Sequence, residues 1–368
     1  MTDPLRIVAL HAQPSRASTF VSTFLGLVLF IVALFYVDTH IVRLEQRESL
    51  VRAARLYADG ETLLVKGDAS RASDRFASAA AIDRRNTRYA LALIHAMVAD
   101  GRRDDAEREL DALLARAGND GAVNLAKARM LAASDQADVA PVYYHRSIYG
   151  EWSADSIRAR NDVRFELAEL LATRHDSGAV LAELLPLEAT LPDSAPMRRR
   201  LAHLFLAAGS PRRSVPILRA LLRSNPKDAD AYTGLGEAAL AVGNFAVAHA
   251  DLSEAQRLQP DDIRSATQLA IADSILVLDP RAKGLTFRQH AARASLLLTM
   301  VIGERERCAG QVPTGEVTNA ARRLGKASAW MSPQTLTALA VQLWASRTTC
   351  VPSYVVNRAL VLLLASME

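Results

Sequence analysis

The histidine and acidic residues of this chain do not form a known catalytic or metal-binding motif. None of its eight histidines belongs to an H-E-x-x-H or H-x-E pattern, which would place metal ligands or a general base on one helix face. The sequence also has no glycine-rich phosphate-binding loop and no G-x-S-x-G turn for a serine nucleophile. Acidic pairs such as Asp104 and Asp105 lie among basic residues, as on solvated helix faces. We therefore expect no catalytic residue, no metal, no cofactor and no small-molecule substrate.

Cys308 and Cys350 are the only two cysteines of the chain. Each follows the end of a predicted helix and stands shortly before a Val-Pro step. Two antiparallel helices that end at one edge of a domain can bring such residues within the roughly 6 Å between Cα atoms that a disulfide requires. The pattern favours a disulfide, which would need an oxidising compartment. The alternative is a pair of unrelated buried thiols.

The segment VYYHRSIYGEW has the residue types of an interface anchor. It places Tyr143, Tyr149 and Trp152 close to Arg146, in a chain that is only 5% aromatic. Aromatic residues and arginine are enriched where binding energy concentrates at interfaces. Tyr144 lies at a repeated apolar position and is expected in the core. The other three aromatic residues either pack this segment onto its own domain or contact a partner protein.

An apolar segment near the N-terminus predicts a membrane anchor. Residues 19–37 carry no charge, and a helix of this length spans roughly 28 Å, close to the hydrocarbon core of a bilayer. The segment ends in Phe35-Tyr36-Val37-Asp38, where a cleavage site would have small residues. We therefore expect a retained transmembrane helix over residues 19–38, after a short segment 1–18. A cleaved signal peptide and a buried core helix are the alternatives.

The orientation of this anchor depends on two signals that disagree. Arg6 and Arg16 precede the apolar segment, and a larger set follows it: Arg43, Arg47, Arg52 and Arg55. If all of these arginines are counted, the positive-inside rule predicts that the main part of the chain stays in the cytoplasm. Arg52 and Arg55, however, belong to the first helix of a folded domain. The predicted disulfide favours the opposite side. We expect a single-pass protein of a bacterial inner membrane with its main part in the periplasm; the cytoplasmic side stays open.

Composition excludes several classes of protein. The chain has 368 residues, of which 50% are hydrophobic and 23% charged, unlike a disordered tail or a polytopic membrane protein. Its 44 basic and 40 acidic residues leave a net charge of only +4. The basic residues are spread among acidic ones and form no dense cluster, so we expect no nucleic-acid partner.

The central part of the chain repeats with a period of 34 residues. Units begin at Ala53, Thr87 and Gly121 and, after an insertion, at Asn161, Ala195 and Ala229. Their fifteenth residues suit a turn between helices and are Gly67, Gly101, Asp135, His175, Gly209 and Gly243. Their twentieth residues are small: Ala72, Ala106, Ala140, Val180, Ser214 and Ala248. Their twenty-fourth are large: Phe76, Leu110, Tyr144, Leu184, Leu218 and Leu252. Each unit is predicted to be a helix hairpin that buries its apolar face by stacking on its neighbours.

This pattern resembles the tetratricopeptide repeat, most clearly in the sixth unit. That unit has Leu235-Gly236, Gly243, Ala248, Ala255 and Pro260 at the signature positions of the family. The resemblance implies an all-α chain in which residues 39–262 form an α-solenoid of about six repeats, with an insertion near 148–160. Residues 263–368 are predicted to form a helical domain that caps the solenoid. In the alternative, its last helix docks on a membrane protein.

Four helices are expected in this C-terminal domain. The first two cover residues 263–278 and 286–306, where apolar residues recur with a helical period. Ser332 and Pro333 suit the N-cap and first turn of the third. Pro352 is expected to open the last helix, which contains the apolar run from Leu360 to Leu364.

The resemblance also predicts which residues face a binding groove. In tetratricopeptide proteins the inner wall is formed by the first helix of each unit, at about its second, fifth and ninth positions. The corresponding candidates include Arg88, His95, Arg129, Glu169, Arg199, His203 and Glu237, with Tyr57, Glu61, Leu91, Leu125, Asp162, Phe165 and Thr233. The Lys and Asn residues with which some family members grip a C-terminal carboxylate are absent. A mixed-charge wall suits a peptide or a protein loop; otherwise these residues are solvated faces of an architectural rod.

These predictions describe a non-enzymatic, membrane-anchored scaffold or assembly factor that binds a protein partner at a membrane complex. The alternative is a stoichiometric structural subunit of a membrane or envelope assembly, such as an energy-converting complex or an export system. An enzyme with its site among residues 281–368 is the interpretation that the sequence supports least.

Overall fold

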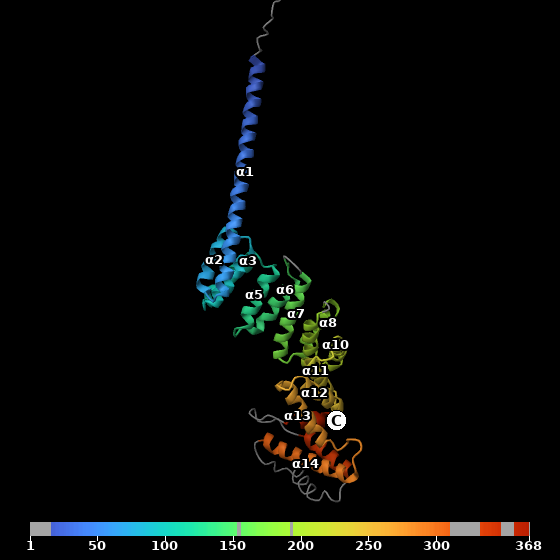
Figure 1. Ribbon diagram of the computed structural model, residues 1–368. Helices are drawn as coiled ribbons and strands as arrows, with labels where there is room; N and C mark the ends of the chain where they lie inside the picture. The colour runs from blue at the N-terminus through green and yellow to red at the C-terminus, as the bar shows by residue number, and fades with distance from the viewer. Residues whose placement is uncertain (1–15, 153–155, 192–193, 310–331, 347–356, 368) are drawn as a thin grey trace, which may run out of the picture. The chain divides into compact units, whose positions relative to one another are not determined.

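A computed structural model describes residues 16–152, 156–191, 194–309, 332–346 and 357–367 (Figure 1). Helices dominate the described residues, as the periodicity predicts. The chain divides into two compact units, Met1–Glu151 and Trp152–Glu368, and this division falls inside the predicted insertion.

The first unit consists of helix hairpins that follow a long N-terminal helix. Its elements are α1 (Arg16–Val65), α2 (Ala69–Ile82), α3 (Thr87–Ala99), α4 (Arg103–Arg116), α5 (Gly121–Ala132), the 3₁₀ turn η1 (Ala137–Val139) and α6 (Ala140–Tyr149).

The second unit continues with hairpins and ends in four further described helices. Its elements are α7 (Ser156–Thr173), α8 (Ser177–Thr190), α9 (Ala195–Ala207), α10 (Pro211–Ser224), α11 (Ala229–Ala241), α12 (Phe245–Leu258), α13 (Ile263–Leu278), α14 (Phe287–Ala309), α16 (Pro333–Ala345) and α17 (Arg358–Ala365). Four of the six predicted repeat starts coincide with the first residue of a helix; α7 begins before its predicted start at Asn161.

The turn inside each hairpin has the conformation that the fifteenth residue predicts. Five of these residues have positive φ: Gly67, Gly101, His175, Gly209 and Gly243. Glycine adopts this left-handed conformation without steric cost, which explains its recurrence there. Asp135 differs, because the third hairpin contains the additional turn η1 in place of a tight connection.

The two repeated core positions are confirmed. All six of the twentieth residues and all six of the twenty-fourth residues are buried. In the sixth repeat Gly236 shows why a small residue is needed opposite the large one. A Cβ atom on Gly236 would lie 2.4 Å from Cγ of Leu252. The helices α11 and α12 therefore touch at a distance that a side chain would prevent.

Helix α1 joins the predicted membrane segment to the first repeat without a break. Its C-terminal part packs on α2, where Ala53 is fully buried and Gly60 lies against the ring of Phe76. Its apolar N-terminal part is exposed, as at Phe35, and Figure 1 shows that part extending away from α2 and α3. Among the described residues, α1 is the one helix long and apolar enough to cross a membrane, judged by length and composition.

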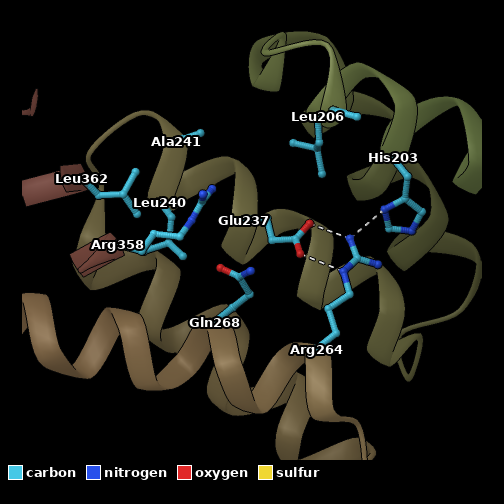
Figure 2. A pocket seen from close by; sticks show the side chains of 10 residues that line it. His203, Leu206, Glu237, Leu240, Ala241, Arg264, Gln268, Arg358 and Leu362 are labelled. Carbon is cyan, nitrogen blue, oxygen red and sulfur yellow. Dashed lines mark hydrogen bonds and ion pairs between the residues drawn. The ribbon is translucent and has the colours of Figure 1, made fainter. Parts of the chain in front are cut away.

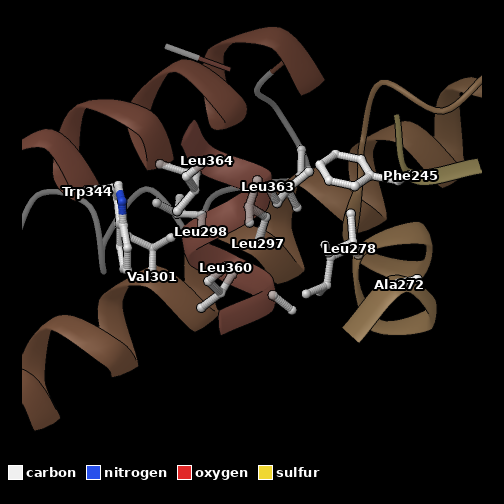
Figure 3. Packing of buried hydrophobic residues seen from close by; sticks show 14 of the residues in the cluster. Phe245, Ala272, Leu278, Leu297, Leu298, Val301, Trp344, Leu360, Leu363 and Leu364 are labelled. Atoms are coloured by element: carbon white, nitrogen blue, oxygen red, sulfur yellow. The ribbon is translucent and has the colours of Figure 1, made fainter. Parts of the chain in front are cut away.

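The C-terminal helices share one hydrophobic core with the last repeat. Phe245 of α12, Leu278 of α13, Leu297 of α14, Trp344 of α16 and Leu363 of α17 belong to a single buried cluster (Figure 3). Burying this apolar surface covers the end of the repeat array, which would otherwise leave its last hairpin exposed to water.

The predicted bounds of the first three of these helices agree with the structure, whereas the last helix begins six residues after its predicted start at Pro352. Helix α13 has its predicted limits, and α16 begins at Pro333 with the Ser332 side chain accepting the Thr335 N–H. Helix α17 begins at Arg358 behind the cap residue Asn357. Pro352 and Cys350 lie outside the described residues, as does the side chain of Cys308, so the predicted disulfide stays a prediction.

Candidate functional site

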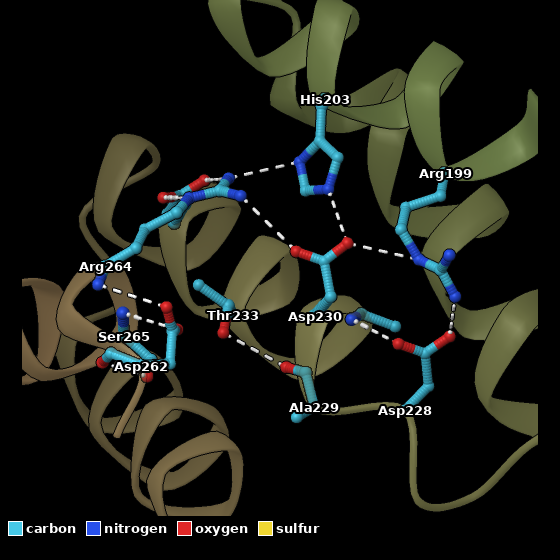
Figure 4. Close-up of polar contacts among 11 residues, drawn as sticks. Arg199, His203, Asp228, Ala229, Asp230, Thr233, Asp262, Arg264 and Ser265 are labelled. Atoms are coloured by element: carbon cyan, nitrogen blue, oxygen red, sulfur yellow. Dashed lines mark hydrogen bonds and ion pairs between the residues drawn. The ribbon is translucent and has the colours of Figure 1, made fainter. Parts of the chain in front are cut away.

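The first helices of successive repeats in the second unit carry charged side chains that contact one another from helix to helix. Arg199 on α9 donates from Nη2 to Oδ2 of Asp228 at 2.5 Å. Its Nε lies 3.1 Å from Oδ2 of Asp230 on α11, an ion pair without the alignment of a hydrogen bond. Arg199 thus links α9 to the start of α11 through two carboxylates (Figure 4).

His203 and Arg264 extend this row to α13. Nε2 of His203 lies 2.9 Å from Oδ2 of Asp230, and Nδ1 of His203 lies 3.1 Å from Nη2 of Arg264. Arg264 also holds Glu237 of α11 in a bidentate pair, with distances of 2.8 Å from Nε and 2.6 Å from Nη2. Figure 4 shows these side chains converging from three helices. We call Arg199, His203, Asp230, Glu237 and Arg264 the ionic row.

Helix caps fix the backbone from which the ionic row projects. The Asp228 side chain accepts the Ala231 N–H and starts α11. The Asp262 side chain accepts the N–H groups of Arg264 and Ser265 and starts α13. Because Asp230 and Arg264 follow directly after these caps, each is held in the first turn of its helix.

The ionic row is electrostatically self-complementary. The hydrogen bond from His203 is the main cause that lowers the pKa of Asp230; burial opposes it, and the nearby arginines act with it. The hydrogen bond to Glu237 is the main cause that raises the pKa of Arg264. Both groups are therefore charged at neutral pH, and their mutual bonds hold the side chains in fixed positions. A wall of this kind is ordered before any partner binds.

A pocket of about 300 Å³ adjoins the ionic row. Its polar lining consists of His203, Glu237, Arg264, Gln268 and Arg358. Its apolar lining comes from α9, α11 and α17: Leu206, Ala207, Leu240, Ala241 and Leu362. Figure 2 shows the Arg358 guanidinium and the Gln268 amide on the side of Glu237 that Arg264 does not occupy. The pocket can therefore take a group that is partly apolar and partly polar.

Three other predicted wall residues of the second unit have different environments. Glu169 on α7 accepts two hydrogen bonds from Arg200 on α9, at 2.6 and 2.7 Å. Phe165 is fully buried under the Arg200 guanidinium, and Thr233 is buried as well. The expectation that Phe165 and Thr233 face the groove is therefore wrong: both belong to the packing between helices.

The first unit has a smaller polar contact of the same type. Nε of Arg88 on α3 donates to the hydroxyl of Tyr57 on α1 at 3.1 Å, and Arg88 lies 3.8 Å from Glu61. This hydrogen bond is the main cause that raises the pKa of Arg88. His95 on α3 and Arg129 on α5 are exposed. Among the predicted inner-wall residues of this unit, Arg88, Tyr57 and Glu61 thus contact one another near the surface.

The aromatic segment forms a second pocket in the first unit, of about 410 Å³. The backbones of Gly121 and Glu151 are joined by a 2.7 Å hydrogen bond, which holds the end of α6 beside the loop before α5. Tyr149 is 74% exposed at the edge of this pocket, whereas Tyr144 is buried as predicted. Tyr143 lies under Arg146, with the guanidinium carbon 5.1 Å from its ring centre. Trp152 is half-buried and belongs to the second unit.

Sequence reasoning missed several residues of the second-unit site. Arg264 is the most informative, because one more step of 34 residues from Ala229 leads to Ile263, and Arg264 is then the second residue of a seventh unit. Asp230 is likewise the second residue of its unit, which begins at Ala229. No periodic signal identifies Arg358, which comes from a helix outside the repeats. Within the described residues, no group of three or more His, Cys, Asp or Glu side chains is arranged to hold a metal ion.

Comparison with known proteins supports the repeat assignment. Two family models described as tetratricopeptide repeat match residues 63–130 and 199–263. The chain is 31% identical over 152 residues to human "Superkiller complex protein 3" and 32% identical over 151 residues to "Tetratricopeptide repeat protein 37" of Xenopus laevis. These matches cover 36% of this chain and 9% and 10% of the relatives. The chain thus spans about a tenth of the length of the curated relatives it matches.

Three solved structures are among those that match this chain. PilW, a widely conserved type IV pilus biogenesis factor, is 16% identical with a TM-score of 0.45, over 59% of this chain and 98% of PilW. A tetratricopeptide repeat protein of Parabacteroides merdae is 14% identical with a TM-score of 0.44, over 75% of this chain and 99% of that chain. A fragment from Cytophaga hutchinsonii is 11% identical with a TM-score of 0.47, over 72% and 98%.

Proposed function

We propose that this chain, a tetratricopeptide repeat protein, is a membrane-anchored, non-enzymatic scaffold that binds an extended segment of a protein partner along α9, α11 and α13. The observation that carries the proposal is the pocket beside the ionic row. Tetratricopeptide repeats mediate protein–protein interactions and are typically non-catalytic. An ordered polar wall next to an apolar recess gives such a segment both orientation and burial.

The anchor in this proposal is the N-terminal part of α1. A helix that exposes Leu, Phe, Ile and Val side chains on all sides has an unfavourable free energy of hydration. The hydrocarbon core of a bilayer removes these side chains from water. Because α1 continues into the first repeat, the membrane would hold that repeat close to its surface. We place the repeats on the periplasmic side of a bacterial inner membrane, a choice that rests on the predicted pairing of Cys308 with Cys350.

The experiment is affinity purification of the full chain from detergent-solubilised membranes. It compares two variants in which tryptophan replaces an exposed alanine, one inside the pocket and one outside it. Ala207→Trp fills the pocket beside Leu206, and the matched control Ala246→Trp enlarges an exposed alanine of α12. We expect Ala207→Trp to lose the co-purifying partner and Ala246→Trp to keep it, with equal helical circular dichroism for both. A partner that is retained equally by the two variants would overturn the proposal.

The same purification addresses the alternative function. A structural subunit would co-purify with its complex in a fixed stoichiometry, whereas a scaffold or assembly factor would be recovered with less than one partner per chain. Extraction of membranes with alkaline carbonate tests the anchor. Mass spectrometry of the purified chain shows whether α1 is retained or cleaved.

A further inference from the structure

We propose that the pocket between α9, α11, α13 and α17 binds the side-chain carboxylate of an Asp or Glu residue in the partner segment, and that Arg358 is the cation that receives it. The proposal rests on the proposed function and names the chemistry of the bound segment. The charges of the pocket, the position of Arg358, the neighbouring lining and the course of the ionic row support it.

Most charges of the pocket are already neutralised by one another. The guanidinium of Arg264 and the carboxylate of Glu237 form a bidentate pair. Both ring nitrogens of His203 are engaged, one with Asp230 and one with Arg264. Arg358 is the remaining charged group of the lining. The pocket therefore has one positive charge that its own lining does not compensate.

The position of Arg358 is not explained by helix stability. Arg358 is exposed and has no hydrogen bond or ion pair within the part of the chain that the structure describes. It is the first residue of α17, where the positive end of the helix dipole disfavours a cation. The cap of this helix is supplied by Asn357, whose side chain accepts two N–H groups. An anion in the pocket would compensate both the guanidinium and the helix terminus.

The rest of the lining favours a carboxylate on a partly apolar segment. The half-buried Gln268 amide points toward the pocket from α13 and can donate to a second carboxylate oxygen (Figure 2). Leu206 and Leu362 provide apolar surface for a neighbouring aliphatic residue. The carboxylate of Glu237 lies in the same pocket and would repel a doubly charged group more strongly than a singly charged one. A volume of about 300 Å³ suits one side chain and part of its neighbour.

A side chain fits the pocket better than a chain terminus does. The ionic row continues from Glu237 through His203 to Arg199, so a segment that lies along it passes the pocket and continues. The anion is therefore assigned to a residue inside the segment. A C-terminal carboxylate is the alternative that the experiment separates.

The experiment measures binding of short peptides to the immobilised full chain by biolayer interferometry. Three probes are used: acetyl-Leu-Glu-Leu-amide, its Gln analogue, and the Gln analogue with a free C-terminal carboxylate. We expect the Glu peptide to bind at least about tenfold more tightly than the Gln amide. Arg358→Gln should abolish this preference. Arg288→Gln, which removes an exposed arginine of α14, should leave it unchanged.

Each other outcome contradicts the assignment. Equal binding of the Glu and Gln amides, no binding of any probe, or a preference that persists in Arg358→Gln would overturn it. Tighter binding of the free-carboxylate probe than of the Glu amide would overturn the side-chain assignment in favour of a terminus. Equal melting temperatures of Arg358→Gln and the unaltered chain exclude a folding defect. If the partner is still lost in Ala207→Trp, the proposed function stands although this inference fails.

Discussion

Nη2 of Arg264 lies 3.1 Å from Nδ1 of His203, although the two residues are 61 positions apart in the sequence. A guanidinium has only donors, so Nδ1 of His203 must accept. The carboxylate of Asp230 can only accept, so Nε2 of His203 carries the ring proton toward it. His203 is therefore neutral in this arrangement, and its tautomer is set by two residues of opposite charge.

The first prediction follows from this tautomer. Nitrogen-15 NMR of the histidine rings at pH 7 should show His203 as a neutral Nε2–H imidazole. His249 provides an internal comparison. Its Nε2 lies 3.1 Å from Oδ1 of Asp273, and no arginine among the described residues donates to its Nδ1. An imidazolium spectrum, or a proton on Nδ1, would show that the contact with Arg264 does not exist in solution.

Asp230→Asn should destabilise the second unit in a pH-dependent way. The folded state lowers the pKa of Asp230, so its carboxylate contributes stability above the pKa of the unfolded chain. That contribution is lost as the pH falls through the folded-state pKa. At pH 7 we expect a loss of about 1 kcal/mol, since charge-assisted bonds contribute up to about 3 kcal/mol and this side chain is partly screened by solvent. Urea denaturation should show the difference shrinking toward pH 3.

Asp251→Asn is the control with the opposite sign. Burial raises the pKa of Asp251, so ionisation of this carboxyl in the folded chain costs stability as the pH rises. We expect Asp251→Asn to leave stability at pH 7 unchanged or slightly increased. If both variants lost the same stability at every pH, charge would not be the cause of either effect.

Gly236→Ala should destabilise the sixth repeat by about 1–3 kcal/mol, the usual cost of an overpacked core. The new Cβ atom would lie 2.4 Å from Cγ of Leu252, so α11 and α12 would have to separate. Gly178→Ala on α8 is matched, because its Cβ atom would meet only Asp176 Oδ1, at 3.7 Å. Alanine is the better helix former, so this control should stabilise by up to about 1 kcal/mol. Thermal denaturation followed by circular dichroism measures both effects; equal melting temperatures would contradict the close approach.

Tyr144 and Tyr149 should separate folding from binding in the first unit. Tyr144→Ala removes a buried ring and should cost about 3–5 kcal/mol of stability. Tyr149→Ala removes an exposed ring, so its stability should change by less than about 0.5 kcal/mol. If Tyr149 anchors a partner, the same change should weaken partner capture by roughly thirtyfold. Unchanged capture would assign Tyr149 to the local packing of the aromatic segment.

The fold could be predicted from the sequence because the residues that pack in the core recur with the period of the repeat. Small residues such as Ala72 and large ones such as Phe76 recur at constant spacing, and each is buried where the spacing puts it. The geometry of a tight turn depends on the residues in the turn, so a glycine such as Gly67 predicts the positive φ that it adopts. The extra turn η1 in the third repeat was not predictable, because its segment has no glycine at the turn position.

The site was only partly accessible. The position of His203 on α9 follows from the repeat, but its contacts require Asp230 and Arg264 from two later helices. Arg358 is harder, because α17 packs against α13 through a core that no period describes. Its entry into the pocket depends on tertiary packing between segments almost a hundred residues apart.

The last prediction concerns Cys308 and Cys350 and, through them, the side of the membrane. In the chain-entropy model, a disulfide that closes a loop of this length contributes about 4 kcal/mol by restricting the unfolded chain. Such a bond persists in an oxidising compartment and is rare in the cytoplasm. We therefore expect alkylation of native membranes under denaturing, non-reducing conditions to modify no cysteine of this chain, and prior reduction to expose both. The reduced chain should also melt at a lower temperature. Two alkylated thiols without reduction would remove the bond. The charge count around the apolar segment, which favours the cytoplasm, would then decide the orientation.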